Sequence, residues 1–255
     1  MTRSVHSSAN ALSPALSKTA AAGLVLSVAA AGTAALAGLG GRWDWWPFST
    51  GFLLLRAAVI GGLFSFAVSL AGSVITRPEA RRRGLTHSVL GLAISFIVVF
   101  VPLSWYAVAR HVPPIHDITT DAGDPPQFNA ILQHRAKAPN PADYGGPEVA
   151  ALQHAAYPDV MPLVLFVPQD QAFDRALAAA RSLRWTIVQK DRQEGRIEAT
   201  DRTIWFGFTD DIVIRVRPED GGSRVDIRSV SRVGKSDLGT NAARIRRFMK
   251  RLAGA

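Results

Sequence analysis

Three long apolar segments constrain the fold of this chain more than any other feature. They cover residues 19–41, 57–76 and 88–109, and none of them contains Asp, Glu, Lys or Arg. A helix of about 20 residues matches a hydrocarbon core of roughly 30 Å. Buried helices of soluble proteins are seldom so uniformly apolar. We therefore predict transmembrane helices over about residues 19–41, 54–76 and 88–109, within a membrane domain of residues 1–110.

Most of the net positive charge of the chain lies close to these segments. The 255 residues carry a net charge of +9, but residues 111–255 hold 20 basic and 18 acidic side chains. Residues 1–110 hold 9 basic and 2 acidic side chains, so most of the excess lies beside the apolar segments. There it acts as a topology signal rather than as a phosphate-binding stripe, which argues against nucleic acid as a partner.

Arginines between the second and third segments orient the predicted helices. This loop carries Arg77, Arg81, Arg82 and Arg83, whereas the first loop has Arg42 beside Asp44. The positive-inside rule places the arginine loop in the cytoplasm, together with the N-terminus and its Arg3 and Lys18. We expect a multi-pass protein of the cytoplasmic (inner) membrane, with the residues after Ala109 in the periplasm. A cleaved signal peptide is the alternative for the first segment, but its apolar run is longer than such peptides need.

Small residues recur every four positions on two of the predicted helices. The ridges are Gly23, Ser27, Ala31 and Ala35 on the first helix, and Gly61, Ser65, Ser69 and Ser73 on the second. Small residues let helix backbones approach closely in lipid, so we expect these two helices to pack together.

Beyond the membrane domain, we predict an extended arm and then a soluble α+β domain. The arm covers residues 111–157 and is rich in Pro, Asp, Asn and Gly, with one short helix near residues 127–135. The domain covers residues 158–255, where apolar periodicity predicts two main helices and an antiparallel sheet. The expected helices are 169–183 and 237–252, with Asp210-Asp211 in a turn and strands at 163–167, 185–190, 196–200, 203–208, 212–217 and 224–231.

Two stretches of this region resemble the bacterial domain-of-unknown-function family 1499. They are residues 196–215 and 225–245, and the arm adds Pro113–Asp121 and Asp124–Phe128. The resemblance covers roughly residues 111–252, and the three-helix anchor is similar to an arrangement in some members. It implies an exported or envelope domain, and it brings no known activity and no catalytic residues.

Arginines crowd one predicted face of the sheet. Alternation places Asp226, Arg228 and Arg232 on one side of their strand, with Arg215 and Arg217 on the corresponding side of the preceding strand. Such a face suits carboxylates or phosphates, or it is a solvated face with cross-strand ion pairs. Ser236 and Asp237 precede the last helix and serve either as its N-cap or as part of an anion site. The basic face of that helix suits anionic lipid or water: Arg244, Arg246, Arg247, Lys250, Arg251.

Features of an enzyme are few. His116-Asp117 invites a general-base interpretation, although adjacent residues rarely adopt that geometry. The chain has no cysteine and no zinc-ligand spacing, so we predict neither a metal nor a cofactor.

We therefore expect a non-enzymatic envelope protein whose periplasmic domain binds a lipid, an anionic ligand or a protein partner. One alternative is a periplasmic hydrolase that uses His116 or a carboxylate such as Asp211. The other is a structural or assembly factor of a membrane complex. A cleft at the sheet would favour the first two hypotheses, and a filled core without a cleft would favour the assembly role.

Overall fold

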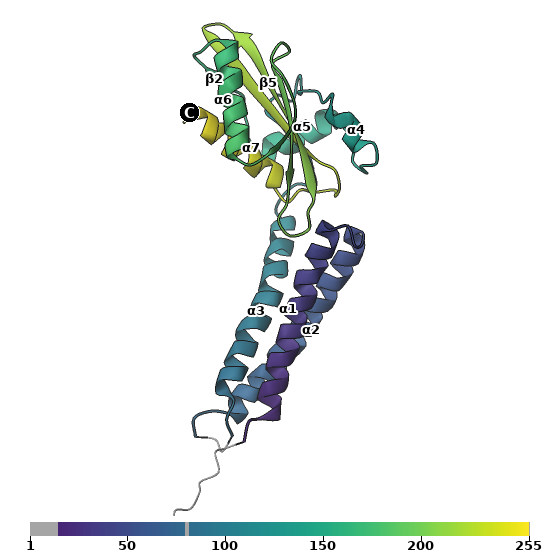
Figure 1. The fold of residues 1–255 in the computed structure, drawn as a ribbon, viewed down its shortest axis with the longest axis vertical. Coiled ribbons are helices and arrows are strands. Elements are labelled where there is room, and N and C mark those ends of the chain that lie inside the picture. The colour runs from purple at the N-terminus through teal and green to yellow at the C-terminus, as the bar shows by residue number, and fades with distance from the viewer. Residues whose placement is uncertain (1–14, 80–81, 255) are drawn as a thin grey trace, which may run out of the picture. The chain divides into compact units, whose positions relative to one another are not determined.

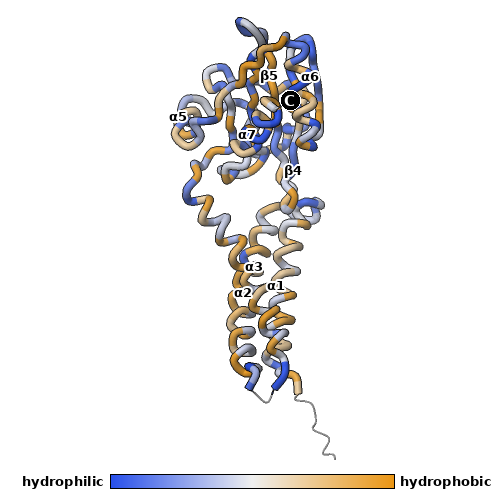
Figure 2. The backbone as a smooth tube through the Cα atoms, turned by 90° about the vertical axis from the view of Figure 1, so that its left-hand side faces the viewer, coloured by the Kyte–Doolittle hydropathy of each residue, from blue (hydrophilic) through white to orange (hydrophobic). Residues whose placement is uncertain are grey.

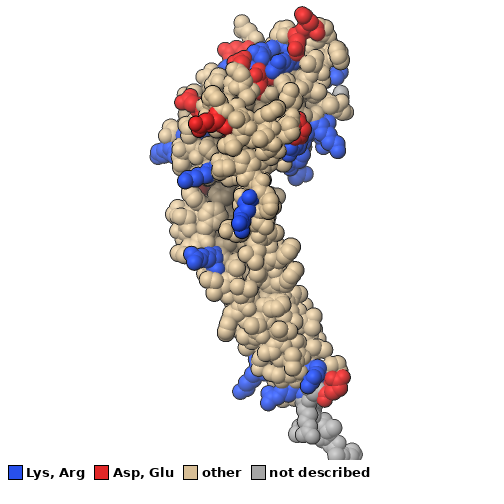
Figure 3. Space-filling view, turned by 180° about the vertical axis from the view of Figure 1, so that it is seen from behind, with Lys and Arg blue, Asp and Glu red and all other residues tan. Residues whose placement is uncertain are grey.

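The computed structural model describes residues 15–79 and 82–254, which divide into two compact units, residues 1–104 and 105–255. Arg3 and Arg81, which enter the orientation argument, lie outside the described residues. Three long helices account for the first unit: α1 (Lys18–Arg42), α2 (Phe48–Ile75) and α3 (Leu85–Ala109), whose last turns belong to the second unit. Each is long and apolar enough to cross a membrane. Figure 2 shows hydrophobic residues along their whole length, and Figure 3 shows few charges on their flanks.

Small side chains make the helix contacts of the first unit. Gly23, Ser27, Ser65 and Ser69 of the predicted ridges are buried, whereas Ala35 is exposed. Helix α2 also packs on α3, because Ser65 and Ser95 share a hydrogen bond of 2.7 Å. A Cβ added at Gly91 of α3 would lie 2.3 Å from Oγ of Ser69. The predicted packing of α1 on α2 is confirmed, and Ser69 of the same ridge also lies against α3.

The second unit is built on one antiparallel sheet, and the predicted α+β class is confirmed (Figure 1). The strand order is β1-β6-β5-β4-β3, and β2 also pairs with β6. The strands are β1 (Asp117–Thr119), β2 (Leu163–Leu165), β3 (Thr186–Asp191), β4 (Arg196–Arg202), β5 (Thr209–Glu219) and β6 (Gly222–Ser231). The helices are α4 (Ile131–Arg135), α5 (Gly146–Ala156), α6 (Gln169–Ser182) and α7 (Thr240–Ala253).

The main core lies between one face of the sheet and helices α6 and α7. Alternating residues of β4, β5 and β6 point into it, and Phe173 of α6 and Phe248 of α7 fill it from the other side. The opposite face is covered by the arm (Figure 1). There Phe128 and Ile131 pack on Val213 and Val230 in a smaller apolar cluster. The sheet is thus buried on both faces.

Two local predictions in this unit are wrong. Residues 203–208 form the turn between β4 and β5 instead of a strand, and Gly207 there has a φ of +69°. Asp210 and Asp211 lie inside β5 rather than in a turn, and both are buried. Both errors have one cause. Asp210 and Asp211 are buried with arginine partners, which hold them in the strand, so the turn falls on the apolar residues before them.

Candidate functional site

The arm brings acidic residues onto the arginine face of the sheet. Thr120 extends the pairing of β1, since its backbone N–H donates to the Ile227 carbonyl and the Ile227 N–H donates to its hydroxyl. The Glu198 carboxylate of β4 accepts the backbone N–H groups of residues 129, 130 and 131 at 2.9–3.2 Å. These bonds hold the arm over the face at both ends of the segment between β1 and α4.

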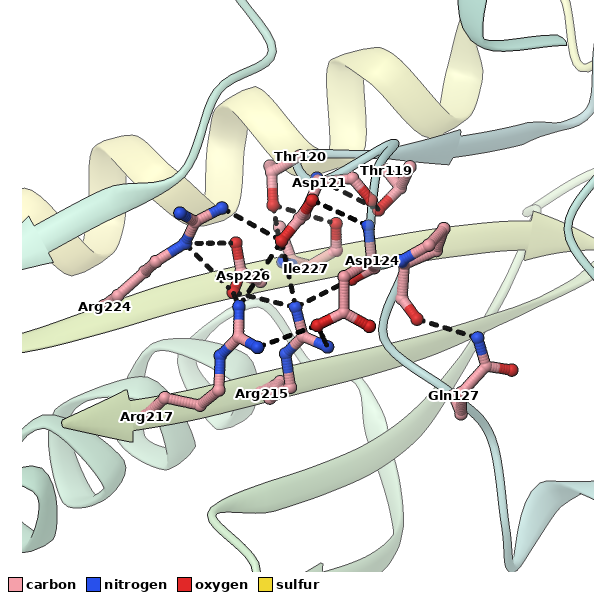
Figure 4. A network of polar contacts seen from close by, with 11 residues as sticks. Thr119, Thr120, Asp121, Asp124, Gln127, Arg215, Arg217, Arg224, Asp226 and Ile227 are labelled. Carbon is pink, nitrogen blue, oxygen red and sulfur yellow. Dashed lines mark hydrogen bonds and ion pairs between the residues drawn. The ribbon is translucent and has the colours of Figure 1, made fainter. Parts of the chain in front are cut away.

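Six charged residues form a cluster at one end of this face, which we call the open cluster (Figure 4). Its members are three arginines and three aspartates: Arg215, Arg217, Arg224, Asp121, Asp124 and Asp226. Register explains the grouping, because Arg215 is paired with Asp226 and Arg217 with Arg224 across β5 and β6. Arg215 and Arg217 donate to the Asp124 carboxylate at 3.0 and 2.8 Å. Asp226 is completely buried beneath them.

The open cluster is balanced in charge and partly accessible. The side chains of Arg217 and Asp124 are 40% and 64% exposed, respectively. The hydrogen bond from Arg217 and the charge of Arg215 hold the pKa of the Asp124 carboxyl below its ordinary value. At neutral pH this carboxylate is therefore ionised and occupies the outer side of two guanidinium groups, as an anionic ligand would.

Arg228 lies apart from this cluster and is fully buried. Its guanidinium donates to both carboxylate oxygens of Asp117, at 2.9 and 2.7 Å. It also stacks between the rings of Phe128 and Tyr144, with its Cζ 5.3 and 5.5 Å from their centroids. Burial raises the pKa of Tyr144 to about 12. Because two rings and a carboxylate enclose it, this arginine joins the arm to β6 and is shielded from solvent.

Arg232 belongs to a third group, around Asp211. Its guanidinium donates to both oxygens of the Asp211 carboxylate at 2.8 and 2.9 Å. Arg135 of α4 donates to the same carboxylate at 2.5 Å from the arm side. The structure therefore distributes the predicted face over three separate groups, and Arg228 and Arg232 do not join Arg215, Arg217 and Asp226.

Ser236 and Asp237 lie before α7, near the core face. The Asp237 carboxylate accepts the N–H groups of Gly239 and Asn241 at 2.8 and 2.7 Å, so it acts as a cap. Burial raises the pKa of this carboxyl above its ordinary value. The Ser236 hydroxyl donates to the Pro113 carbonyl and accepts the Leu238 N–H. Both residues are engaged within the fold.

The predicted basic face of α7 is only partly solvent-exposed. Arg244 is buried and donates to Asp201 and Asp210 at 3.0 and 2.6 Å, so its place on a wet face was wrongly predicted. Arg246 pairs with Asp159 at 2.5 Å on the surface. Arg247 and Arg251 are exposed.

Two carboxylates of the hydrolase hypothesis, Asp117 and Asp211, are held by arginines. Asp117 faces Arg228 rather than its neighbour His116, and Asp211 lies between two arginines. Within residues 15–79 and 82–254, no three His, Asp or Glu side chains come together in a way that could hold a metal ion. Shallow, open hollows lie at helix ends of the first unit, beside Arg77 and beside Arg83.

Sequence reasoning missed the acidic half of this face. The residues concerned are Asp117, Asp121, Asp124, Glu198 and, among the bases, Arg135 and Arg224. The alternation of Glu198 with Ile197 and Ala199 indicates which face of the sheet Glu198 occupies, but it does not indicate its partners. Asp121 and Asp124 fall in the stretch that carries the family resemblance, although no local pattern pairs them with residues 91–103 positions away.

Together these features define a class: an α+β domain that closes its charged sheet face with its own arm and follows three helices long enough to cross a membrane. Residues 117–252 match the family described as protein of unknown function, DUF1499. Because the match covers more than half of the 255 residues, the chain belongs to that family, and the resemblance in its sequence is confirmed. No curated protein matches the chain.

Proposed function

We propose that this chain is a non-enzymatic envelope protein that binds an anionic group, a carboxylate or a phosphate, at the open cluster. The three apolar helices would hold it in the cytoplasmic membrane, with the N-terminus inside and the sheet domain in the periplasm. The positive-inside rule supports that orientation, since Arg77, Arg82 and Arg83 lie in the loop between α2 and α3.

The observation that carries the proposal is the position of Asp124. Arg215 and Arg217 bind its carboxylate at 3.0 and 2.8 Å, although that carboxylate is more than half exposed. Exposed ion pairs contribute little to stability, typically about 0–1 kcal/mol, so replacing Asp124 by an external anion costs little. The arginines are already spaced and oriented for an oxyanion.

The charges of the cluster define the ligand. Without Asp124, three guanidinium groups face two carboxylates, Asp121 and Asp226, and the cluster carries a net charge of +1. One anionic group restores the balance. The fully buried Asp226 fixes the arginines from below and leaves their outer N–H groups for the ligand.

The test removes the internal competitor. Inorganic phosphate should bind the Asp124→Asn variant about tenfold more tightly than it binds the wild type. The affinity is measured from the thermal shift of the full chain in detergent at constant ionic strength. Asp174→Asn is the matched control, because Asp174 on α6 is also an exposed aspartate held by an arginine, Arg192. Adding Arg217→Gln to Asp124→Asn should abolish the shift.

The outcomes separate the ligand sources. A phosphate response in Asp124→Asn alone supports a small anion, whereas a response only to vesicles containing phosphatidylglycerol supports a lipid headgroup. Equal responses of Asp124→Asn and Asp174→Asn, unaffected by Arg217→Gln, would overturn the proposal.

A second candidate function is the assembly role. The observation that favours it is the filling of both sheet faces, one by α6 and α7 and the other by the arm. Cross-linking of the full-length protein in membranes tests it, and a specific membrane partner without bound anion would support this role.

A further inference from the structure

Two exposed apolar side chains lie beside the open cluster, one on strand β2 and one directly after it. Val164 of β2 is 39% exposed, and Phe166 is 85% exposed. In the register of the sheet, Val164 is paired with Arg224 of β6. Residues directly opposite each other on antiparallel strands have Cβ atoms about 4.5–5.5 Å apart. An apolar side chain therefore adjoins one of the three arginines that converge in the open cluster (Figure 4).

The chain turns at Phe166 and stays on the same side of the sheet. The Val167 N–H donates to the Leu165 carbonyl at 2.8 Å, which closes a tight turn around Phe166. Gly222 shares the face of Arg224, because the two residues are two positions apart on β6. A Cβ added at Gly222 would lie 3.0 Å from the Cα of Phe166. The backbone of Phe166 therefore lies on the sheet face that carries the open cluster.

Together the arginines and these two residues form a strip that is cationic at one end and apolar at the other. Val164 and Phe166 are two positions apart, so the apolar end continues for about 7 Å beyond the level of Arg224. The cationic end is held in place, because Arg224 binds the carboxylates of Asp121 and Asp226 at 3.0 Å each. A single exposed apolar residue is ordinary. Apolar surface that adjoins a few fixed polar groups is typical of sites for small ligands.

We infer, on the basis of the anion site proposed above, that the ligand of the open cluster is a single-chain amphiphile. Its oxyanion takes the place of the Asp124 carboxylate beside Arg215 and Arg217, and its aliphatic tail lies on Val164 and Phe166. Between the two, the tail passes the side chain of Arg224, whose methylene stem adds apolar surface. Each methylene of the tail that leaves water strengthens binding, so the affinity rises with the length of the tail.

The test compares two phosphate monoesters that share a head group, methyl phosphate and hexyl phosphate. Each is titrated into the full-length Asp124→Asn chain in detergent at constant ionic strength, and the affinity is taken from the thermal shift. Phe166→Ser is the test variant, and a substitution at so exposed a position leaves the fold intact. Leu132→Ser is the matched control, because Leu132 of α4 is also apolar and is 45% exposed. Helix α4 binds Asp211 through Arg135, at the opposite end of β5 from the open cluster.

Phe166→Ser should lower the affinity for hexyl phosphate about fivefold, because the tail loses its apolar contact, and should leave the affinity for methyl phosphate unchanged. Leu132→Ser should change neither affinity. Partition of hexyl phosphate into micelles is the same for every variant, so it cancels from the comparison.

An unchanged affinity of Phe166→Ser for hexyl phosphate, or equal losses for the two esters, would overturn the amphiphile as ligand. If methyl phosphate still binds, the anion site itself stands. Binding of hexyl phosphate that survives Arg217→Gln would also overturn the amphiphile, because the tail alone would then account for it. Binding of neither ester would overturn both the anion site and the amphiphile.

Discussion

Arg228 and Arg244 are the largest side chains that the described structure buries completely. Each is matched by carboxylates with good geometry, Arg228 by Asp117 and Arg244 by Asp201 and Asp210. Desolvation of a charge costs several kcal/mol, and the attraction between the partners offsets it only while both remain. We infer that these pairs chiefly specify how the arm and α7 dock on the sheet, because another register would leave buried charges unpaired.

Replacement of Arg228 by Met should therefore strongly destabilise the folded domain. It leaves the Asp117 carboxylate buried without its partner, and we expect a loss of about 3–5 kcal/mol in the free energy of unfolding. The double variant Arg228→Met with Asp117→Leu should recover part of this loss. Chemical unfolding of the full chain in detergent, followed by near-UV circular dichroism, measures both.

Arg217→Met is the control for that experiment, since Arg217 is partly exposed. We expect it to cost less than about 1 kcal/mol. Similar losses in Arg217→Met and Arg228→Met would contradict the distinction between the open cluster and the buried pair.

Asp237 should give the domain a stability that falls with rising pH. Its folded pKa is raised by burial above the unfolded value of 3.8, so the protonated form favours the folded state. That contribution is fully present below the unfolded pKa and is lost as the pH rises through the folded pKa. The difference in unfolding free energy between wild type and Asp237→Asn should therefore decrease from acid to neutral pH. A difference that increases over this range would show that the sign is wrong.

At the scale of residues, alternation correctly placed Arg215, Arg217, Asp226 and Arg228 on one face of the sheet. It could not place their partners, because Asp117 is 111 positions from Arg228 and Asp124 is 91 positions from Arg215. A strand pattern records which face a side chain occupies, while the segment that covers this face is set by long-range packing.

At the scale of elements, the long periodic segments were predictable, as were short β2 and α4, whereas other short elements were not. Helix α6 and strands β4, β5 and β6 lie where their periodicity predicted them. Strand β1 has three residues, and α5 was missed although Pro147 and Glu148 mark its first turn. Residues 203–208 alternate like a strand, but they form the turn between β4 and β5, and alternation over six residues is too short to distinguish the two.

The packing of α1 on α2 should depend on individual glycines. A Cβ at Gly23 would lie 2.5 Å from Oγ of Ser69, whereas a Cβ at Gly32 of the same helix meets nothing within 4 Å. Gly23→Val should thus lower stability by about 1–3 kcal/mol through overpacking. Gly32→Val should change it by less than about 0.5 kcal/mol. Thermal unfolding in detergent compares the two, and equal effects would argue against close α1–α2 contact.

At the scale of the molecule, composition and hydropathy were enough to predict three apolar helices followed by an α+β domain. The charge asymmetry between the two parts argues against nucleic acid as a partner, and this stays a prediction. What remained beyond the sequence was the second layer on the sheet. An arm rich in proline looks like a linker, and only its pairing with β6 shows that it completes the domain.

That pairing determines when the domain can complete its fold during synthesis. The carboxylates of Asp117 and Asp124 leave the ribosome about a hundred residues before the arginines that neutralise them. By then α1, α2 and α3 have been translated, while the domain still lacks β5 and β6. Since long-range contacts form only when both segments exist, the domain closes at the end of translation. A chain interrupted before Arg228 therefore carries all three apolar helices and a domain whose charged sheet face stays incomplete.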